Sequence, residues 1–174
     1  MSVFITSNLL LNQTLPDSNF PSMQAYTDNL IQNWNSVVGP KDKVIVMGKV
    51  GNSKLITIKS IIEKLNGDKY LVNYDENVNY RRILWKQSGF LRVWSADFFY
   101  DTTFKNKKVR VYFTNNPNKE LQSNEYAVIG SQKMDALFSD KKINVSLNKW
   151  DYTPLSFETV MQLLQDLEVN EWEK

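Results

Sequence analysis

The sequence predicts a mixed α/β fold, with a parallel layer built by its first half and short antiparallel strands in its second half. Continuous apolar segments such as 44–47 alternate with segments whose apolar residues recur every three or four positions. These two patterns are typical of buried strands and of amphipathic helices. Beyond residue 90 the segments are short, aromatic and β-branched, which favours antiparallel pairing.

In the first half, strands are predicted at 3–7, 44–47 and 70–72. Ser22 is a suitable N-cap for a helix whose apolar stripe runs down to the Gly39-Pro40 stop, since serine side chains accept hydrogen bonds from the first helical turn. A second helical stripe occupies 58–65 and ends at Gly67. Alternation of strands and helices indicates a parallel sheet with helical crossovers.

In the second half, a helix is expected at 78–87 and strands at 92–94, 98–104, 109–113, 126–129 and 143–147. Asn106 and its lysine neighbours form a plausible hairpin turn. A last amphipathic helix begins after Ser156. The sequence has no internal repeat and no linker, so we expect a single domain over residues 1–174.

The amino-acid composition excludes most hydrolase mechanisms. The 174 residues include no histidine and no cysteine, so the chain lacks the commonest general base, the commonest neutral metal ligand and every thiol nucleophile. The net charge of +2 creates no global field that marks a nucleic acid or a membrane as the partner. The amino terminus carries no signal-peptide pattern, and we therefore expect a cytoplasmic location.

Five segments carry a resemblance to a known family. They are FITSNLLLNQ, LIQNWNSVVGPKDKVIVMGKV, EKLNGDKYLVNYDEN, VYFTNNP and INVSLNKWDYTPLSFETV. In order and spacing they resemble the small phage and bacterial members of the calcineurin-like metallophosphoesterase family. The resemblance implies a four-layer α/β/β/α sandwich, with two facing mixed sheets, outer helices and two metal ions at the carboxyl ends of the strands.

Every metal-binding motif of that family is altered in this chain. The aspartate and histidine of the first motif fall on Asn8 and Leu10, and the aspartate that bridges the two metals falls on Lys49. A lysine ammonium repels a divalent cation and offers it no acceptor. The remaining motifs fall on Asp75, Glu76, Asn77, Asn115, Ser131 and Lys133. The resemblance therefore implies a vestigial site with no metal, no cofactor and no catalytic residue.

For several residues the sequence allows two interpretations. Lys49 either pairs with Asp75 or Glu76, replacing the charge of the metals, or extends into solvent. The aromatic residues at 94–104 either pack in the core, which is favoured, or form a docking surface. The basic residues Arg81, Arg82 and those at 105–110 are either solvated or contact phosphates. Trp150 and Tyr152 are either packing residues or contacts for a partner.

We expect a pseudoenzyme that acts as a protein-interaction module. Its Asn- and Lys-rich composition and the subfamily resemblance suggest a bacteriophage protein, located in the host cytoplasm or in the virion, with a phage or host protein as partner. The alternatives are a nucleic-acid-binding protein, or a protein that binds a nucleotide or phosphorylated ligand without hydrolysing it. The nucleic-acid alternative requires Arg81, Arg82, Lys107, Lys108 and Arg110 to share one face.

Overall fold

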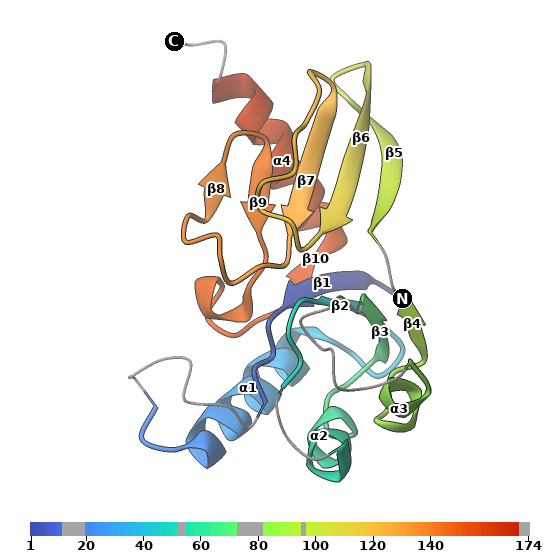
Figure 1. Cartoon of the computed structure of the whole chain (residues 1–174), viewed down its shortest axis with the longest axis vertical. Helices are drawn as coiled ribbons and strands as arrows, with labels where there is room; N and C mark the ends of the chain where they lie inside the picture. Colours follow the sequence, from blue (N-terminus) through green and yellow to red (C-terminus); the bar gives the residue numbers. More distant parts are fainter. Residues whose placement is uncertain (12–19, 52–54, 73–81, 95–96, 171–174) are drawn as a thin grey trace.

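The computed structural model describes the chain except for residues 12–19, 52–54, 73–81, 95–96 and 171–174. Its strands form two five-stranded sheets, each of mixed direction (Figure 1). The first sheet has the order β10-β1-β2-β3-β4 and the second β5-β6-β7-β9-β8. The predicted mixed α/β class with two sheets is confirmed.

The first sheet is parallel apart from one edge strand. Its strands are β1 (Val3–Ser7), β2 (Lys43–Met47), β3 (Asp68–Val72), β4 (Arg92–Trp94) and the antiparallel β10 (Leu155–Ser156). Helices α1 (Met23–Val37), α2 (Leu55–Ile62) and α3 (Arg82–Gln87) connect the parallel strands. Their buried residues share one hydrophobic core with one face of this sheet. The alternation predicted from the first half of the sequence is therefore confirmed.

Helix α1 is fixed at its start by a cap and near its end by an Asn-Trp-Asn motif. The Ser22 side chain accepts a hydrogen bond of 3.1 Å from the N–H of Ala25. Near the other end, Trp34 Nε1 donates to the carbonyl of Asn66, and Asn35 Nδ2 donates to the carbonyl of Lys64. Both carbonyls lie in the turn after α2. The motif therefore attaches α1 to the neighbouring crossover.

The second sheet and the last helix enclose the other core. The strands are β5 (Phe98–Phe104), β6 (Lys107–Thr114), β7 (Glu125–Ile129), β8 (Phe138–Ser139) and β9 (Lys142–Asn144). Helix α4 (Phe157–Asn170) passes behind β7 and β9 in Figure 1. Val160 and Leu164 of α4 share a core with Val111 of β6 and with Ile5 of the first sheet. This core therefore joins α4 to both sheets.

The hairpin between β5 and β6 forms as predicted. Lys105 and Asn106 connect the two strands, and both have positive φ, 45° and 70°. Two successive residues with positive φ are the requirement of a type I′ turn, whose twist suits a hairpin. Asparagine adopts this conformation more readily than other non-glycine residues, which is why Asn106 marked the turn.

Three sequence predictions need correction. The strands of the second half are not all antiparallel, because β4 pairs in parallel with β3, and β7 pairs in parallel with β6 and with β9. Helix α3 joins β3 to β4 and residues 115–124 join β6 to β7, so the chain crosses back before each of these strands.

The strand predicted at 143–147 is shorter, because β9 ends at Asn144 and a 3₁₀ helix begins at Leu147. The aromatic segment is not uniformly buried: Phe104 is buried, but Phe99 and Tyr100 are 52% and 45% exposed. Strand β5 is an edge strand, so side chains on both of its faces can extend beyond the cover of neighbouring elements. For the predicted helix at 78–87, residues 78–81 lie outside the described part.

Candidate functional site

Residues that follow four parallel strands meet at one place, which we call the strand-end cluster. It contains Asn8 after β1, Gly48 and Lys49 after β2, Asn115 after β6, and Gly130 and Ser131 after β7. A Cβ atom added to Gly48 would collide with the carbonyl oxygen of Gly130 and with Asn8 Oδ1. One added to Gly130 would lie 2.5 Å from Asn115 Oδ1. The cluster is therefore closely packed, and it joins the two sheets.

Asn8 is the best-connected side chain of the cluster. It is 3% exposed. Its Oδ1 accepts a hydrogen bond of 3.0 Å from the backbone N–H of Lys49, and its Nδ2 donates 2.8 Å to the hydroxyl of Ser146. A longer contact of 3.3 Å joins Nδ2 to the hydroxyl of Ser7. One amide thus connects the ends of β1 and β2 with the residue two positions beyond β9.

The backbone around Asn8 has an uncommon conformation. Asn8 and Leu10 have positive φ, 59° and 50°, which costs a residue with a β-carbon about 1–2 kcal/mol in its left-handed form. Tyr26 supports this turn, because its hydroxyl donates 2.7 Å to the carbonyl of Leu9. Burial raises the pKa of Tyr26 above its ordinary range, so the phenol stays protonated and able to donate.

Asn115 differs from Asn8 although both are buried amides. It is 7% exposed, and among the described residues neither its Oδ1 nor its Nδ2 has a hydrogen-bond partner. A buried polar group without a partner costs about 1–3 kcal/mol. Asn115 is therefore the one place in the described cluster where stability is lost to an unpaired amide.

The other predicted site residues occupy different environments. Leu10 and Ser131 are buried, whereas Lys133 is exposed. Ser131 Oγ accepts a hydrogen bond of 3.2 Å from the backbone N–H of Lys133. Lys49 is half-buried. The structure thus brings Asn8, Lys49, Asn115 and Ser131 together, as the sequence analysis required, and leaves the Lys133 side chain at the surface.

Four predicted residues lie outside the described part of the chain: Asp75, Glu76, Asn77 and Arg81. The ion pair between Lys49 and Asp75 or Glu76 stays a prediction. Arg82 begins α3. Of the other basic residues, Arg110 is bound in two places to Asp101, at 2.7 and 3.0 Å. A nucleic-acid phosphate that binds Arg110 would therefore have to compete with the Asp101 carboxylate for the same guanidinium.

Trp150 and Tyr152 make packing contacts. Trp150 Nε1 donates 2.8 Å to the carbonyl of Asn144, and its ring lies edge-on to Phe138. Tyr152 packs edge-on against Phe20 and Tyr26, with ring centroids 5.0 and 5.5 Å apart. Both side chains are half-buried. These contacts favour the packing interpretation over a role in gripping a partner.

The chemistry of the cluster is that of amides, hydroxyls and one ammonium group. Asn8, Asn115 and Ser131 offer neutral oxygen atoms, and Lys49 offers a positive charge. Within the described ranges there is no group of three or more acidic, histidine or cysteine residues that could hold a metal ion. Divalent cations need several charged or imidazole ligands in fixed geometry. The described cluster can hydrogen-bond, but its residues do not suit a binuclear metal centre.

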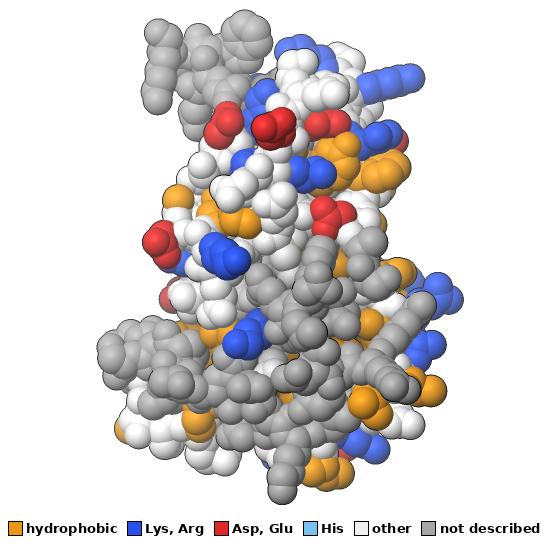
Figure 2. Space-filling model, in the orientation of Figure 1, with side chains coloured by type: hydrophobic (Ala, Val, Ile, Leu, Met, Phe, Trp, Pro, Cys, Tyr) orange, Lys and Arg blue, Asp and Glu red, His pale blue; other side chains and the backbone are white. Residues whose placement is uncertain are grey.

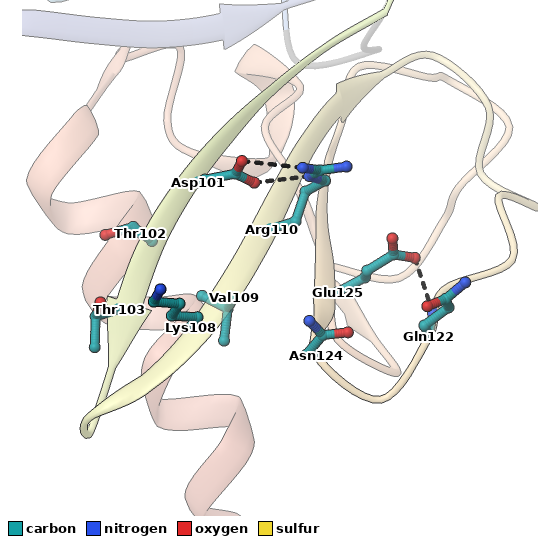
Figure 3. Close-up of a pocket in the computed structure, with 9 residues that line it drawn as sticks. All are labelled: Asp101, Thr102, Thr103, Lys108, Val109, Arg110, Gln122, Asn124 and Glu125. Atoms are coloured by element: carbon teal, nitrogen blue, oxygen red, sulfur yellow. Dashed lines mark hydrogen bonds and ion pairs between the residues drawn. The ribbon is translucent and has the colours of Figure 1, made fainter.

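A hollow of about 600 Å³ lies at the opposite end of the second sheet. Figure 3 shows its lining residues, among them Asp101, Arg110 and Glu125. Hydrogen bonds from Arg110 lower the pKa of Asp101, and a hydrogen bond from the N–H of Gln122 is the largest cause that lowers the pKa of Glu125. Asp101 and Arg110 of this hollow form an ion pair, and the hollow is separate from the strand-end cluster.

Sequence reasoning missed two members of the site. Ser146 lies inside the strand predicted at 143–147 and was not singled out, but in the structure it follows β9 by two residues and supplies the hydroxyl that Asn8 binds. Gly48 directly follows the apolar run at 44–47, and its missing side chain allows Asn8 and Gly130 to approach. A polar or glycine residue directly after a buried strand was the available signal, since ligands and functional groups gather at strand ends in α/β proteins.

Comparison with known proteins shows the fold more clearly than the family. No family model matches the chain. It is 25% identical over 151 residues to an uncharacterized protein of Methanocaldococcus jannaschii, a match that covers 84% of this chain and 79% of that protein. The crystal structure of a protein of unknown function from Aquifex aeolicus superimposes with a TM-score of 0.63. That match covers 93% of this chain and 98% of the other, at 17% identity, and it shows a shared fold.

A search of the described helices for a membrane span finds none that is both long and apolar enough.

Proposed function

We propose that this protein is a non-catalytic relative of the calcineurin-like metallophosphoesterases that acts as a protein-interaction module. The hydrogen bonding of Asn8 carries the proposal. Its amide occupies the position where the resemblance implies a metal-binding carboxylate, and both ends of the amide bond to the protein itself. A side chain bonded in this way stabilises the junction of the strands and does not take part in catalysis.

The architecture supports the same proposal. Two mixed sheets share a core, and α1, α2 and α3 pack on the first of them. In this proposal the fold is a variant of the four-layer metallophosphoesterase sandwich in which α4 packs into the core common to both sheets. The strand ends that would hold metal ions in the family are the ends at which Asn8, Lys49 and Asn115 meet.

The face of the second sheet that turns away from α4 is the proposed interaction surface. We call it the outer face and define it by Phe99, Arg110, Tyr112, Lys119 and Glu125. Among the described elements no helix covers it, and charged side chains of both signs surround exposed hydrophobic ones over this sheet (Figure 2). Aromatic residues and arginine are enriched in the parts of interfaces that contribute most to affinity.

Contacts within the outer face hold its side chains in place before binding. The guanidinium carbon of Arg110 lies 4.0 Å from the centre of the Phe99 ring, and Lys119 Nζ lies 4.0 Å from the centre of the Tyr112 ring. The Tyr112 hydroxyl donates 2.9 Å to Glu125. Ordered aromatic side chains lose less conformational entropy when a partner binds, so this arrangement suits recognition of another protein.

The resemblance and the Asn- and Lys-rich composition further support a bacteriophage origin. The partner is then another virion component or a protein of the host, and the complex forms in the host cytoplasm or in the virion.

The test is affinity purification from the source cell with the parent protein and two variants. Phe99→Asp alters the outer face, whereas Ile56→Asp alters α2, where Ile56 is 71% exposed. We expect a co-purifying protein that Phe99→Asp loses and Ile56→Asp retains, and binding of that purified protein weakened at least tenfold by Phe99→Asp. Phosphodiesterase activity that requires added Mn²⁺ and disappears with a chelator would contradict the non-catalytic part of the proposal.

A further inference from the structure

The first sheet carries a second cavity, which shares no lining residue with the strand-end cluster or the outer face. It has a volume of about 510 Å³ and is lined by Val3, Lys43, Ile45, Tyr70, Leu91, Arg92 and Trp94. Small-molecule sites occupy about 300–1,000 Å³. The strand register explains the lining, because Ile45 pairs with Tyr70, and Tyr70 with Arg92. These three side chains form one row across the sheet, on the face opposite α1, α2 and α3.

The cavity has an aromatic wall. The rings of Tyr70 and Trp94 are nearly parallel, with an angle of 16° between their planes and 5.7 Å between their centroids. Both side chains are half-buried, so each is held in place and still reaches the cavity. Trp94 is further supported by Phe98, at 5.9 Å. Paired rings that line a cavity are suited to stacking with a planar aromatic ligand.

The charges of the lining have a single sign. Lys43 and Arg92 are the two cationic residues of the described lining, and no carboxylate is among the described lining residues. Asp68 pairs with Lys43 in the strand register, so one acid lies beside the cavity without lining it. Ammonium and guanidinium groups are the usual protein partners of phosphate oxygens. A phosphate bound at this rim would lie between two cations that come from different strands.

We propose that this cavity binds a nucleoside monophosphate. The base stacks on the Tyr70 and Trp94 rings over the apolar floor formed by Val3 and Ile45, and the phosphate contacts Lys43 and Arg92. One stacking pair and one pair of cations match one base and one phosphate, and the cavity is of small-molecule size. The site is independent of the protein partner proposed for the outer face.

The test is titration of the full chain, labelled with ¹⁵N, with AMP, adenosine and inorganic phosphate. We expect AMP to shift the resonances of the lining residues, including the indole N–H of Trp94, and to bind at least five times more tightly than adenosine or phosphate alone. Tyr70→Leu keeps an apolar side chain but removes the ring, and it should weaken AMP about tenfold.

Paired charge variants separate the phosphate contact from general electrostatics. The double variant Lys43→Gln with Arg92→Gln should abolish the preference for AMP over adenosine and leave adenosine binding unchanged. The matched control, Lys107→Gln with Lys108→Gln, removes two exposed cations from the β5–β6 hairpin and should leave the preference intact. Arg92, Lys107 and Lys108 are exposed and Lys43 is half-buried, and circular dichroism verifies that each variant is folded.

Three outcomes would overturn the proposal. Equal affinity for AMP and adenosine in the parent protein would remove the phosphate contact. Shifts confined to residues outside the lining would place the ligand elsewhere. A tetranucleotide that binds more than ten times as tightly as AMP would show that the cavity is part of a nucleic-acid surface rather than a mononucleotide site.

Discussion

Asn8 Oδ1 accepts a hydrogen bond from the backbone N–H of Lys49 across the ends of two adjacent parallel strands, at 3.0 Å. The two residues occupy the positions where the family resemblance implies two metal-binding carboxylates. One is the acceptor of a structural hydrogen bond, and the other is its donor. This relationship makes the strand-end cluster a source of stability, and it can be tested by substitution.

The first prediction concerns the Asn8 amide. Asn8→Ala removes hydrogen bonds to Lys49 and Ser146 and leaves a buried N–H and a buried hydroxyl without this partner. We expect the free energy of unfolding to fall by about 2–4 kcal/mol, since each such bond contributes about 1 kcal/mol and each unpaired buried group costs more. Urea denaturation followed by far-ultraviolet circular dichroism measures the change. A loss below 0.5 kcal/mol, roughly the scale of a surface substitution, would contradict it.

The second prediction uses Asn115 as the matched position. Asn115→Ala makes the same chemical change at a buried amide to which the described part of the chain offers no hydrogen-bond partner. Removing an unpaired polar group offsets the lost packing, so we expect the free energy of unfolding to stay within about 1 kcal/mol of the parent. The same denaturation experiment measures it. A loss as large as that of Asn8→Ala would show that an ordered water or another group satisfies this amide.

The third prediction concerns the Asn-Trp-Asn motif of α1. Asn35 donates to the carbonyl of Lys64 and accepts from the N–H of Asn66. Asn35→Ala should therefore lower the free energy of unfolding by about 1–2 kcal/mol. Gln32→Ala, at an exposed position of the same helix, serves as the control and should change it little. Equal effects of the two variants on thermal unfolding would mean that only helix propensity is involved.

The fourth prediction is a pH dependence. Hydrogen bonds from the N–H groups of Ser2 and Gly39, at 2.7 and 2.9 Å, hold the pKa of Asp42 below its ordinary value. A depressed carboxyl pKa contributes stability above the unfolded pKa of about 3.9, and this is lost as the pH falls through the folded pKa. We expect Asp42→Asn to melt below the parent at pH 7, with the difference shrinking below about pH 4.

Thermal melts from pH 2.5 to 7 check this prediction. Asp101 and Glu125 also have lowered pKa values, but they are present in both proteins and largely cancel in the comparison. A difference between parent and variant that stays constant over the whole range would mean that the Asp42 charge contributes nothing.

The fifth prediction concerns Lys49. Lys49→Asp restores the charge type of the family's bridging ligand, but the chain contains no histidine to complete the site. We expect no stoichiometric binding of Mn²⁺, measured by isothermal titration calorimetry. We also expect a lower melting temperature than for the control Lys41→Asp, because the positive charge proposed to balance Asp75 or Glu76 is lost. Binding of one or more equivalents of Mn²⁺ would refute the expectation that the site is inactive.

The sequence by itself determined the local elements whose pattern is repeated along the chain. The apolar stripe predicted for α1 consists of Met23, Tyr26, Leu30, Trp34 and Val37. Its three central members are buried, Met23 is partly buried, and Val37 at the helix end is 41% exposed. The apolar run at 44–47 predicted β2, and Asn106 predicted the hairpin turn. These features depend on periodicity and on the conformational preference of single residues, which are properties of neighbouring positions.

Only the tertiary structure decided which distant residues meet and which faces stay uncovered. The resemblance implied that Asn8, Lys49, Asn115 and Ser131 come together. It did not imply that Asn8 is bonded through both ends of its amide, while Asn115 has no hydrogen-bond partner among the described residues. The sequence pattern favoured Phe99 and Tyr100 as core residues, yet both are exposed because β5 is an edge strand. Hydrogen-bond partners and burial depend on the packing of elements far apart in the chain, and local sequence patterns carry no information about that packing.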